Sequence, residues 1–366
     1  MSSHSYWQGP IAAEPDFENV LKVLRGERPE RPTLGELFMN GPLYRRVIGS
    51  EKTAELASRT DMPMSILERV YGYRALGYDY ATVSASDFAF PRGEAGQKHT
   101  RSLNDGALVT DRESFEQLQW TEPGACPSDR LEKLADDLPA GMKLVVIGPS
   151  GVLENVIRLT GYEQLCLMVF DDPELVQEIF DAVGERLVRY YRDAVQYETV
   201  GAIWANDDWG FKTQTMLSPE DMRRFVIPWH ARIAETAHAA GKPVIMHSCG
   251  CLDAVMDDIV NVIGHDGKHS YEDAIKPVEE AYEALFGRIA VIGGIDVDFV
   301  CRSSPEEVFA RSRAMIERTA DRGGYMLGTG NSVPEYVPDE NYFAMLAAVW
   351  EHRPGYELPK RAVGCA

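Results

Sequence analysis

The chain has 366 residues, of which 45% are hydrophobic, and its formal net charge is −20. This charge disfavours nucleic acids and anionic membranes as binding partners. The sequence has no apolar run of about 18 residues, so we expect no membrane span. Residues 1–7 lack the basic region and apolar core of a secretory signal, and we therefore expect a cytoplasmic protein.

The first expected elements are an N-terminal arm with a helix, assigned to residues 1–30. Helical spacing over Glu18–Leu24 is followed by two helix-breaking prolines, Pro29 and Pro32. Thr33–Phe38 could form a first strand, and a helical stretch over 51–76 precedes a strand predicted at 78–84.

The segment 97–111 predicts a hairpin excursion, because it contains the turn signal Asn104-Asp105-Gly106 between polar segments. A strand over 143–148 then leads into the turn Gly148-Pro149-Ser150-Gly151. The backbone N–H groups of this turn could hold a phosphate or carboxylate. The turn matches no known nucleotide motif, so ordinary turn chemistry is the favoured interpretation.

In the second half of the chain, strands and helices alternate. The expected helices cover 163–170, 173–198, 218–240, 304–321 and 339–352. The expected strands cover 201–205, 244–246, 260–264 and 289–296, and a strand with its loop covers 324–331. This alternation is typical of a parallel sheet in an α/β protein. Eight strand candidates favour a (β/α)8 TIM barrel over residues 31–352 as one domain, with 353–366 as a C-terminal tail.

Polar residues follow most of these strands. In (β/α)8 barrels the active site lies at the carboxyl ends of the strands, so residues far apart in the chain would meet there. Such residues here are Glu36, Asn206, Asp207, Asp208, His247, Cys249, His265, Asp266, Lys268, His269, Asp296, Thr329 and Asn331. Their convergence favours a metal site or an acid–base site.

His247 and Cys249 form the most specific pair. They stand two residues apart at the end of a predicted strand, so their side chains would point the same way. Imidazole nitrogen and thiolate sulfur are both good zinc ligands. Taken alone, however, a core histidine beside a buried free cysteine is the more common arrangement.

Several motifs together indicate a family. They are Gly161-Tyr162-Glu163 with 172–176 (Asp-Pro-Glu-Leu-Val), 207–210 (Asp-Asp-Trp-Gly) before 217–219, 246–250 (Met-His-Ser-Cys-Gly), and 293–298 before 304–308. Over about residues 30–350 the chain resembles the uroporphyrinogen decarboxylase superfamily. That superfamily has a (β/α)8 fold and includes the decarboxylase and cobamide-dependent methyltransferases.

The resemblance implies two branches. The decarboxylase has an N-terminal Arg-Gln-Ala-Gly-Arg segment that grips substrate carboxylates, whereas the comparable segment 33–40 has no arginine and carries Glu36. A substrate with eight carboxylates needs several cations in its pocket. Few cations follow the strands here, chiefly Lys212 and Lys268, and this favours the methyltransferase branch.

For the methyltransferase branch, the resemblance implies a zinc ion held by a His-x-Cys pair and a distant cysteine. His247 and Cys249 match the pair, but residues 328–332, where the distant cysteine is expected, contain none. The third zinc ligand is therefore open. The candidates are His269, Glu272, Asp208 or a water molecule.

The remaining site predictions concern catalysis and substrate binding. The predicted catalytic residues are Asp207, Asp208 and Glu36, with either aspartate orienting His247 or serving as a general acid. The predicted substrate-binding residues are Asn206, Trp209, Asn331 and Tyr78. For the two aromatic residues, core packing is the competing interpretation.

We interpret the sequence as a zinc-dependent methyltransferase component of a cobamide system. It would move a methyl group between a small substrate (a methoxylated compound, an amine or a thiol) and a corrinoid protein that carries the cobamide. The alternatives are a decarboxylase of a tetrapyrrole or smaller acid, and a non-catalytic barrel that binds a small ligand. The sequence is compatible with a homodimer but does not decide the oligomeric state.

Overall fold

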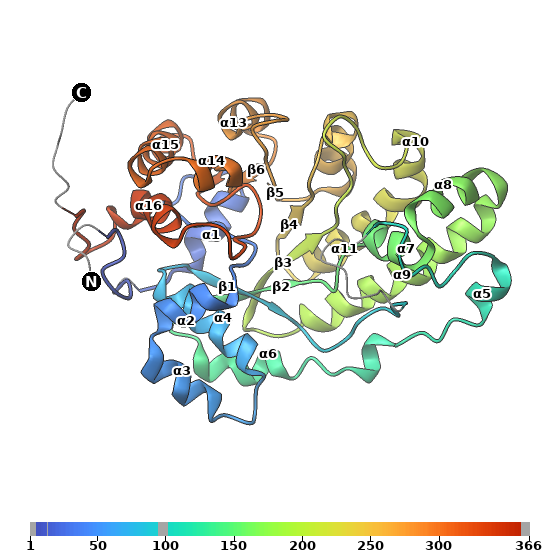
Figure 1. Ribbon diagram of the computed structural model, residues 1–366, viewed down its shortest axis with the longest axis horizontal. Helices are drawn as coiled ribbons and strands as arrows, with labels where there is room; N and C mark the ends of the chain where they lie inside the picture. The colour runs from blue at the N-terminus through green and yellow to red at the C-terminus, as the bar shows by residue number, and fades with distance from the viewer. Residues whose placement is uncertain (1–4, 13, 94–101, 360–366) are drawn as a thin grey trace. The chain divides into compact units, whose positions relative to one another are not determined.

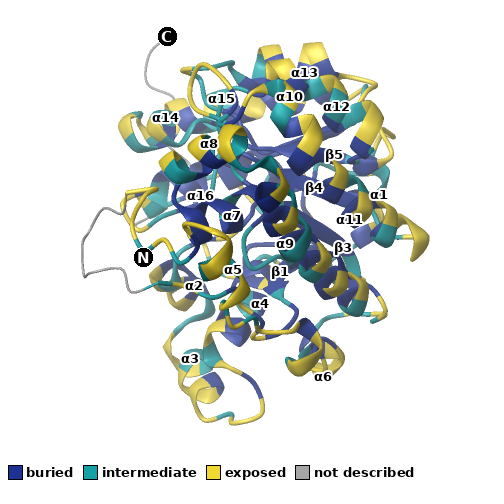
Figure 2. Ribbon diagram, turned by 90° about the vertical axis from the view of Figure 1, so that its right-hand side faces the viewer, coloured by how far each residue is buried: buried dark blue, intermediate teal, exposed yellow. Residues whose placement is uncertain are grey.

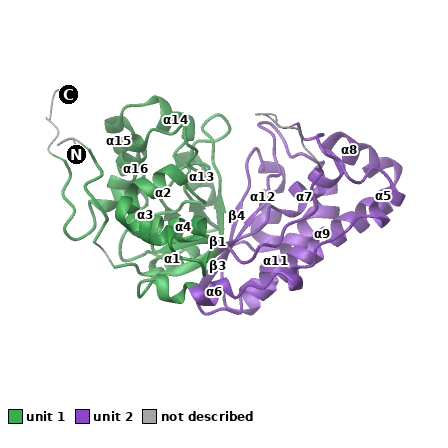
Figure 3. Ribbon diagram, turned by 60° about the horizontal axis from the view of Figure 1, so that its bottom comes forward, with its two compact units in different colours: residues 1–83, 134–145, 267–366 green, residues 84–133, 146–266 purple. Residues whose placement is uncertain are grey.

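The computed structural model describes residues 5–12, 14–93 and 102–359 of the chain. The chain divides into two compact units, each built from segments that are separate in the sequence (Figure 3). Unit 1 comprises residues 1–83, 134–145 and 267–366, and unit 2 comprises residues 84–133 and 146–266. The assignment of 31–352 to one barrel domain stays a prediction.

Unit 2 contains the strands β3 (Val200–Asn206) and β4 (Val244–His247), which pair in parallel. Its longer helices are α7 (Val152–Thr160), α8 (Tyr162–Asp171), α9 (Pro173–Ala194) and α11 (Ile227–Ala239). Its shorter helical pieces are α5 (Arg112–Glu116), η1 (Pro123–Ala125), α6 (Arg130–Lys133), α10 (Pro219–Asp221), η3 (Met222–Val226), η4 (Asp253–Val255), α12 (Met256–Asp258) and η5 (Ile259–Ile263). As predicted, Ser218 begins a helical stretch, because its hydroxyl accepts the N–H of Asp221 at 3.1 Å.

Unit 1 contains the N-terminal helices and the C-terminal part of the chain. Its helices are α1 (Phe17–Leu24), α2 (Gly41–Ile48), α3 (Ser50–Ala57), α4 (Met64–Ala75), η2 (Leu134–Asp137), α13 (Val278–Leu285), α14 (Val297–Arg302), α15 (Pro305–Thr319) and α16 (Asp339–Trp350). Its strands are β5 (Gly267–His269), β6 (Ala290–Ile292) and β7 (Tyr325–Met326), and the strands β1 (Tyr80–Ser84) and β2 (Lys143–Ile147) begin in this unit.

The strands β1 to β7 stand in one sheet in the order of the chain (Figure 1). The pairs β3–β4, β5–β6 and β6–β7 are all parallel. A parallel pair needs a crossover connection, and helical segments supply it here. The predicted α/β class with a parallel sheet is therefore confirmed, while the closed eight-stranded barrel stays a prediction.

The first predicted strand, 33–38, is present only as isolated bridges. Leu34 forms a parallel bridge with Leu327, just beyond β7. On the side toward β1, the N–H of Glu36 donates to the hydroxyl oxygen of Tyr80 at 2.7 Å. In a regular strand this N–H would donate to a backbone carbonyl of the neighbouring strand. Here it donates to a side-chain hydroxyl instead.

The strand predicted at 260–264 is wrong. Residues 259–263 form a π-helical turn that continues α12, and the strand β5 begins only at Gly267. Ile259 and Ile263 are buried four residues apart, whereas Val262 is 60% exposed. This is the burial pattern of a helix, so the β-branched side chains here cover one face of a helix end.

The turn of the predicted hairpin is present. The N–H of Asp105 donates to the carbonyl of Ser102 at 3.1 Å, and Gly106 has a φ of 80°. Residues 102–111 form no strand, and residues 97–101 lie outside the described residues. The hairpin therefore stays a prediction beyond its turn.

The strands of unit 2 lie in the buried interior of that unit, as the burial colours of Figure 2 show. Val244, Ile245 and Met246 on β4 have no exposed surface, which fits the apolar run in the sequence. Buried on both faces, such a strand delivers only its last residues to a solvent-accessible site. No helix in the described part of the chain has the length and apolar character needed to cross a membrane.

Candidate metal centre

Three side chains of unit 2 that could hold a metal ion come together where β3 and β4 end. The donor atoms of Asp208, His247 and Cys249 all lie within 4.8 Å of one another. Nε2 of His247 is 3.7 Å from Sγ of Cys249 and 3.6 Å from Oδ1 of Asp208. The structure thus brings together the predicted His-x-Cys pair and one of the four candidate third ligands.

The register of the two strands accounts for this meeting. Asn206 on β3 stands opposite His247 on β4. The pairing continues one residue further, because the N–H of Asp207 donates to the carbonyl of His247 at 2.9 Å. Asp208 therefore leaves β3 beside Cys249, whose N–H donates to Oδ1 of Asp208 at 2.9 Å.

Two glycines hold the loops after these strands in contact. Gly250 has a φ of +88°, a conformation that other residues adopt only with strain. A Cβ atom at Gly250 would lie 2.2 Å from the carbonyl carbon and oxygen of Gly210. The backbone of one loop therefore lies directly on the other, and this fixes the two loops that carry the donor atoms.

The donor set fits a zinc ion. Zinc bonds of about 2.0–2.1 Å to nitrogen and about 2.3 Å to sulfur, at tetrahedral angles, place the two donors about 3.6 Å apart. The 3.7 Å between Nε2 of His247 and Sγ of Cys249 agrees with this value. The 3.6 Å between Nε2 of His247 and Oδ1 of Asp208 is close to the roughly 3.4 Å that zinc bonds to nitrogen and oxygen would give. The His247 side chain is 8% exposed and the Asp208 side chain 43% exposed, so solvent reaches the cluster at Asp208.

Asp207, predicted as catalytic, is completely buried and bound to the start of α7. The N–H groups of Leu153 and Glu154 each donate to its carboxylate at 2.9 Å, and Nε2 of His230 lies at 2.9 Å. A Cβ atom at Gly151 would lie 2.1 Å from the Asp207 side chain. The carboxylate beside the glycine-rich turn 148–151 is therefore that of Asp207, a residue of the same chain, and not that of a ligand.

Two buried histidines lie next to this carboxylate. The ring of His230 meets the rings of Trp209 and His265 edge-on, at centroid distances of 4.8 Å and 5.8 Å. Among the described residues, neither ring nitrogen of His265 has a hydrogen-bond partner. Burial lowers the pKa of His265 well below its usual value, so its ring is neutral near pH 7. Sequence analysis missed His230, which lies within α11 without any recognisable motif.

A carboxyl group that titrates near neutral pH lies in the same environment. Burial, together with the negative charges of Asp207 and Asp208, raises the pKa of Glu154 to about 7. Its carboxylate accepts the N–H of Gly151, the residue before α7, at 3.1 Å and so caps the start of that helix. In the sequence, nothing distinguishes Glu154 from a glutamate that only caps a helix.

The predicted substrate-binding residues of unit 2 are parts of the strand ends. Oδ1 of Asn206 accepts the N–H of Gly148 at 3.2 Å. Trp209 is completely buried, and its backbone N–H donates to Oγ of Ser248 at 3.0 Å. Substrate contact by Asn206 and Trp209 stays a prediction.

Glu36 and Tyr78 lie in unit 1, and both are completely buried. The Glu36 carboxylate accepts the hydroxyl of Thr329 at 2.9 Å and its N–H at 3.2 Å. Burial raises the pKa of Glu36 to about 8. The hydroxyl of Tyr78 hydrogen-bonds to that of Tyr342 at 2.7 Å, and its ring meets that of Tyr73 edge-on. These contacts of Tyr78 are those of a core residue.

Unit 1 also contains the other predicted site residues. Nε2 of His269 lies 3.1 Å from the carbonyl oxygen of Thr329, and Oδ1 of Asn331 accepts the N–H of Ser332 at 2.7 Å. Glu272 lies in the segment that follows β5. Metal binding by His269 and Glu272, and substrate binding by Asn331, stay predictions.

The comparison with protein families decides the broad assignment. The model of the uroporphyrinogen decarboxylase (URO-D) family matches residues 16–352. The chain belongs to the URO-D family. The superfamily predicted from the motifs is therefore confirmed.

URO-D proteins similar to this chain have names from both branches. The methylated-thiol–coenzyme M methyltransferase of Methanosarcina mazei is 25% identical over 195 residues, which are 53% of this chain and 49% of that protein. The uroporphyrinogen decarboxylase of Syntrophotalea carbinolica is 23% identical over 310 residues, which are 82% of this chain and 87% of that protein. The match to the M. mazei enzyme thus spans about half of its length, as does the match to the decarboxylase of Myxococcus xanthus (53%).

A solved structure of a methyltransferase from Methanosarcina mazei has a similar fold. The TM-score is 0.67 at 16% sequence identity, and the superposition covers 93% of this chain and 99% of the other. At this identity the likeness concerns the fold alone. It supports the arrangement of the parallel strands described above.

Proposed function

We propose that this URO-D protein is a cytoplasmic, zinc-dependent methyltransferase component of a cobamide system. It would move a methyl group between a small methoxylated compound, amine or thiol and a corrinoid protein. The observation that carries this proposal is the cluster of Asp208, His247 and Cys249, whose donor atoms lie within 4.8 Å of one another. The similarity to a methylated-thiol methyltransferase of M. mazei supports it.

Each residue of the cluster has a separate task in this proposal. His247 and Cys249 bind the metal from β4 and its loop, and Asp208 binds it from the loop after β3. The N–H of Cys249, which donates to Asp208 at 2.9 Å, orients that carboxylate. When zinc is bound, it supplies Lewis-acid chemistry that lowers the pKa of a substrate thiol or polarises a methyl ether. Three protein ligands leave one position for the substrate.

The distribution of cations favours this branch over porphyrinogen decarboxylation. The ammonium group of Lys268 donates to the carbonyl of Ser270 and lies 4.2 Å from the ring centroid of Tyr271. It is therefore engaged inside unit 1. The segment 33–40 contains no arginine. A substrate rich in carboxylates would find few partners among these residues.

A decarboxylase is the second candidate. The observation in its favour is that relatives named uroporphyrinogen decarboxylase align over 82% and 88% of the chain. Such an enzyme would release CO2 from a tetrapyrrole or a smaller acid. The two candidates differ in whether activity depends on the metal cluster.

The first experiment is the zinc content of purified protein, measured by mass spectrometry for wild type, Cys249→Ala and Asp208→Asn. We expect about one zinc ion per chain in wild type, none in Cys249→Ala and a reduced content in Asp208→Asn. Cys126→Ala is the matched control, since Cys126 is a free cysteine of unit 2 outside the cluster. A wild-type protein that holds no zinc and takes up none would contradict the proposal.

The activity test offers free cob(I)alamin to methoxylated compounds, methylamines and methyl thioethers as methyl donors, and offers methylcobalamin to thiols as methyl acceptors. The cobalamin spectrum reports the transfer in either direction. Methyl transfer that is lost in Cys249→Ala and kept in Cys126→Ala would support the methyltransferase. Release of CO2 from a tetrapyrrole by metal-free protein, with no methyl transfer to or from cobalamin, would favour the decarboxylase instead.

A further inference from the structure

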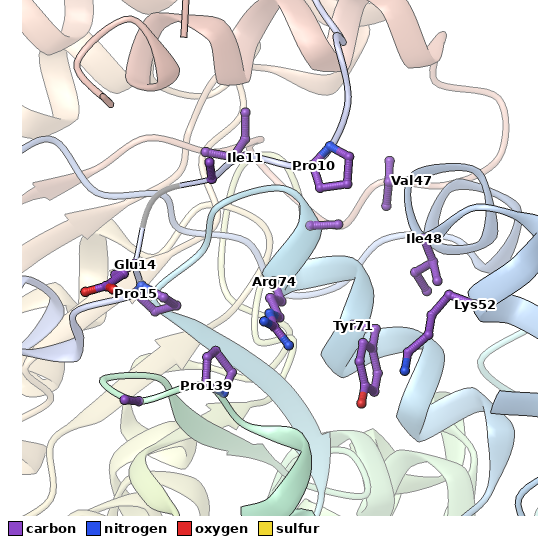
Figure 4. A pocket seen from close by; sticks show the side chains of 13 residues that line it. Pro10, Ile11, Glu14, Pro15, Val47, Ile48, Lys52, Tyr71, Arg74 and Pro139 are labelled. Carbon is purple, nitrogen blue, oxygen red and sulfur yellow. The ribbon is translucent and has the colours of Figure 1, made fainter. Parts of the chain in front are cut away.

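A cavity of about 660 Å³ lies within unit 1, between the N-terminal arm, α2, α4 and the loop before β2 (Figure 4). Its volume is in the range of cavities that hold small organic ligands. About half of its wall surface is apolar, including parts of Ile11 on the arm and of Val47 and Ile48 on α2. Proline rings, such as those of Pro10 and Pro139, add rigid surface.

The arm over this cavity is fastened at both ends. The N–H of Ile11 donates to the carbonyl of Ala75, the last residue of α4, at 2.9 Å. The N–H of Asp16 donates to Oδ1 of Asp79 at 2.9 Å, just before β1. These hydrogen bonds hold the arm in place. The binding site is therefore largely formed before a ligand binds, and little binding energy is needed to order the arm.

One side of the cavity carries positive charge. Arg74, Tyr71 and Lys52 all line it, and their side chains are visible together in Figure 4. Tyr71 and Arg74 are three residues apart on α4 and therefore share a face of that helix. The ammonium group of Lys52 lies 4.4 Å from the centroid of the Tyr71 ring.

Among the described residues, Arg74 lacks the ion pair that several other arginines of unit 1 form. Arg31, Arg45 and Arg59 each pair with a carboxylate. Across the described part of the chain, no carboxylate lies within 4.0 Å of the Arg74 guanidinium, although Glu14 also lines the cavity. Arg74 is exposed, and in a chain whose net charge is −20 an arginine that lines a partly apolar cavity with no carboxylate partner is a ready site for an anion.

We propose that this cavity binds a small organic anion, with its carboxylate or phosphate group on Arg74. The planar guanidinium can donate two parallel hydrogen bonds to either group. Lys52 contributes less charge, because its ammonium group already pairs with the carboxylate of Glu55 at 2.6 Å. The apolar body of the ligand would pack against Ile11, Val47 and Ile48. All lining residues belong to unit 1, whereas the metal centre belongs to unit 2, so this inference is independent of the proposed function.

The test is calorimetric titration of the full chain with three probes that share one apolar body: 2-naphthoate, 2-naphthyl phosphate and 2-naphthamide. We expect at least one of the two anions to bind about tenfold or more tightly than the neutral amide. A charge-assisted hydrogen bond accounts for a difference of this size. The head group that binds more tightly identifies the ligand as a carboxylate or a phosphate.

Variants then assign the binding to the cavity. Arg74→Gln should weaken binding of the anion about tenfold or more and leave naphthamide unchanged, while Arg74→Lys should retain part of the affinity. Arg28→Gln is the matched control, since Arg28 is an exposed arginine of unit 1 that does not line the cavity. Because the Arg74 side chain holds no ion pair, Arg74→Gln should keep the circular dichroism spectrum and melting temperature of wild type.

Three results would overturn the proposal. The first is no binding of either anion. The second is binding of both 2-naphthoate and 2-naphthyl phosphate that is no tighter than that of 2-naphthamide, which would show an apolar site without anion selectivity. The third is an equal effect of Arg74→Gln and Arg28→Gln, which would show a response to net charge alone.

Discussion

Asp207 and Asp208 are neighbours in the chain, but their carboxylates have different surroundings. Successive side chains of an extended strand point to opposite faces, so the two residues diverge as β3 ends. Asp207 is buried against the N-terminus of α7 and His230, whereas Asp208 reaches the donor atoms of His247 and Cys249. One aspartate therefore holds the strand end in place, and the other is free to bind a metal.

Glu36 supports a prediction about pH. Burial raises its pKa from 4.5 to about 8, so the folded state keeps a proton that the unfolded chain releases between these values. The free energy of unfolding should therefore fall as the pH rises from about 4.5 to about 8, and this loss should then level off. Glu36→Gln has no charge to bury, so its stability relative to wild type should increase by up to about 1.4 kcal/mol per pH unit.

Urea denaturation of both proteins at pH 5, 6, 7 and 8 measures this difference. Glu335→Gln is the control, because Glu335 is an exposed glutamate of the same unit. For this control we expect a difference from wild type that does not change with pH. Parallel curves for Glu36→Gln and wild type would mean that the Glu36 carboxyl does not keep its proton in the folded state.

At the scale of elements, the candidate metal centre depends on the contact between the loops after β3 and β4. Gly210 and Gly250 meet backbone to backbone, and no side chain fits between them. Strand register places the ends of β3 and β4 side by side. The contact between the loops then fixes the positions of Asp208 and Cys249. A substitution that displaces one of these loops should therefore displace the other as well.

Gly250→Ala tests this coupling. The added Cβ would lie 2.2 Å from the Gly210 backbone, so the loops must separate and the zinc content should fall to less than half of the wild-type value. Gly241→Ala is the matched control, because Gly241 also has a positive φ, +70°, but nothing lies within 4 Å of its Cβ position. It should lose about 1–2 kcal/mol of stability and keep its zinc. Full zinc content in Gly250→Ala would show that the loop contact is dispensable.

At the scale of the whole molecule, the side chains of the candidate metal centre come from one compact unit built from separate segments of the chain. A metal that binds only the folded unit must stabilise it by mass action. The effect disappears when a ligand side chain is removed. The metal should therefore contribute to thermal stability as well as to chemistry.

We expect EDTA to lower the melting temperature of zinc-loaded wild type by on the order of 5 °C. In Cys249→Ala, EDTA should change nothing, because no metal is bound. Differential scanning calorimetry with and without the chelator measures both values. A wild-type melting temperature unaffected by EDTA, in protein shown to lose its zinc, would mean that the site forms without contributing to stability.

Much of the architecture follows from the sequence because its signals are local. The Ser218 cap and the helical spacing of 18–24 depend on residues within a few positions of one another, and both features are present in the structure. Where local signals conflict, the prediction was wrong: the β-branched run at 260–264 belongs to a helix end because burial, not propensity, decides its form.

The sequence by itself determined the parallel α/β class, the superfamily and the pair His247 and Cys249, since each rests on short patterns along the chain. Only the tertiary structure decided that Asp208 lies with this pair and that Asp207 is bound to α7. These contacts join residues tens of positions apart, through strand register and a close approach of two glycines. No periodicity along the chain encodes such distances, because they arise only when separate elements pack together.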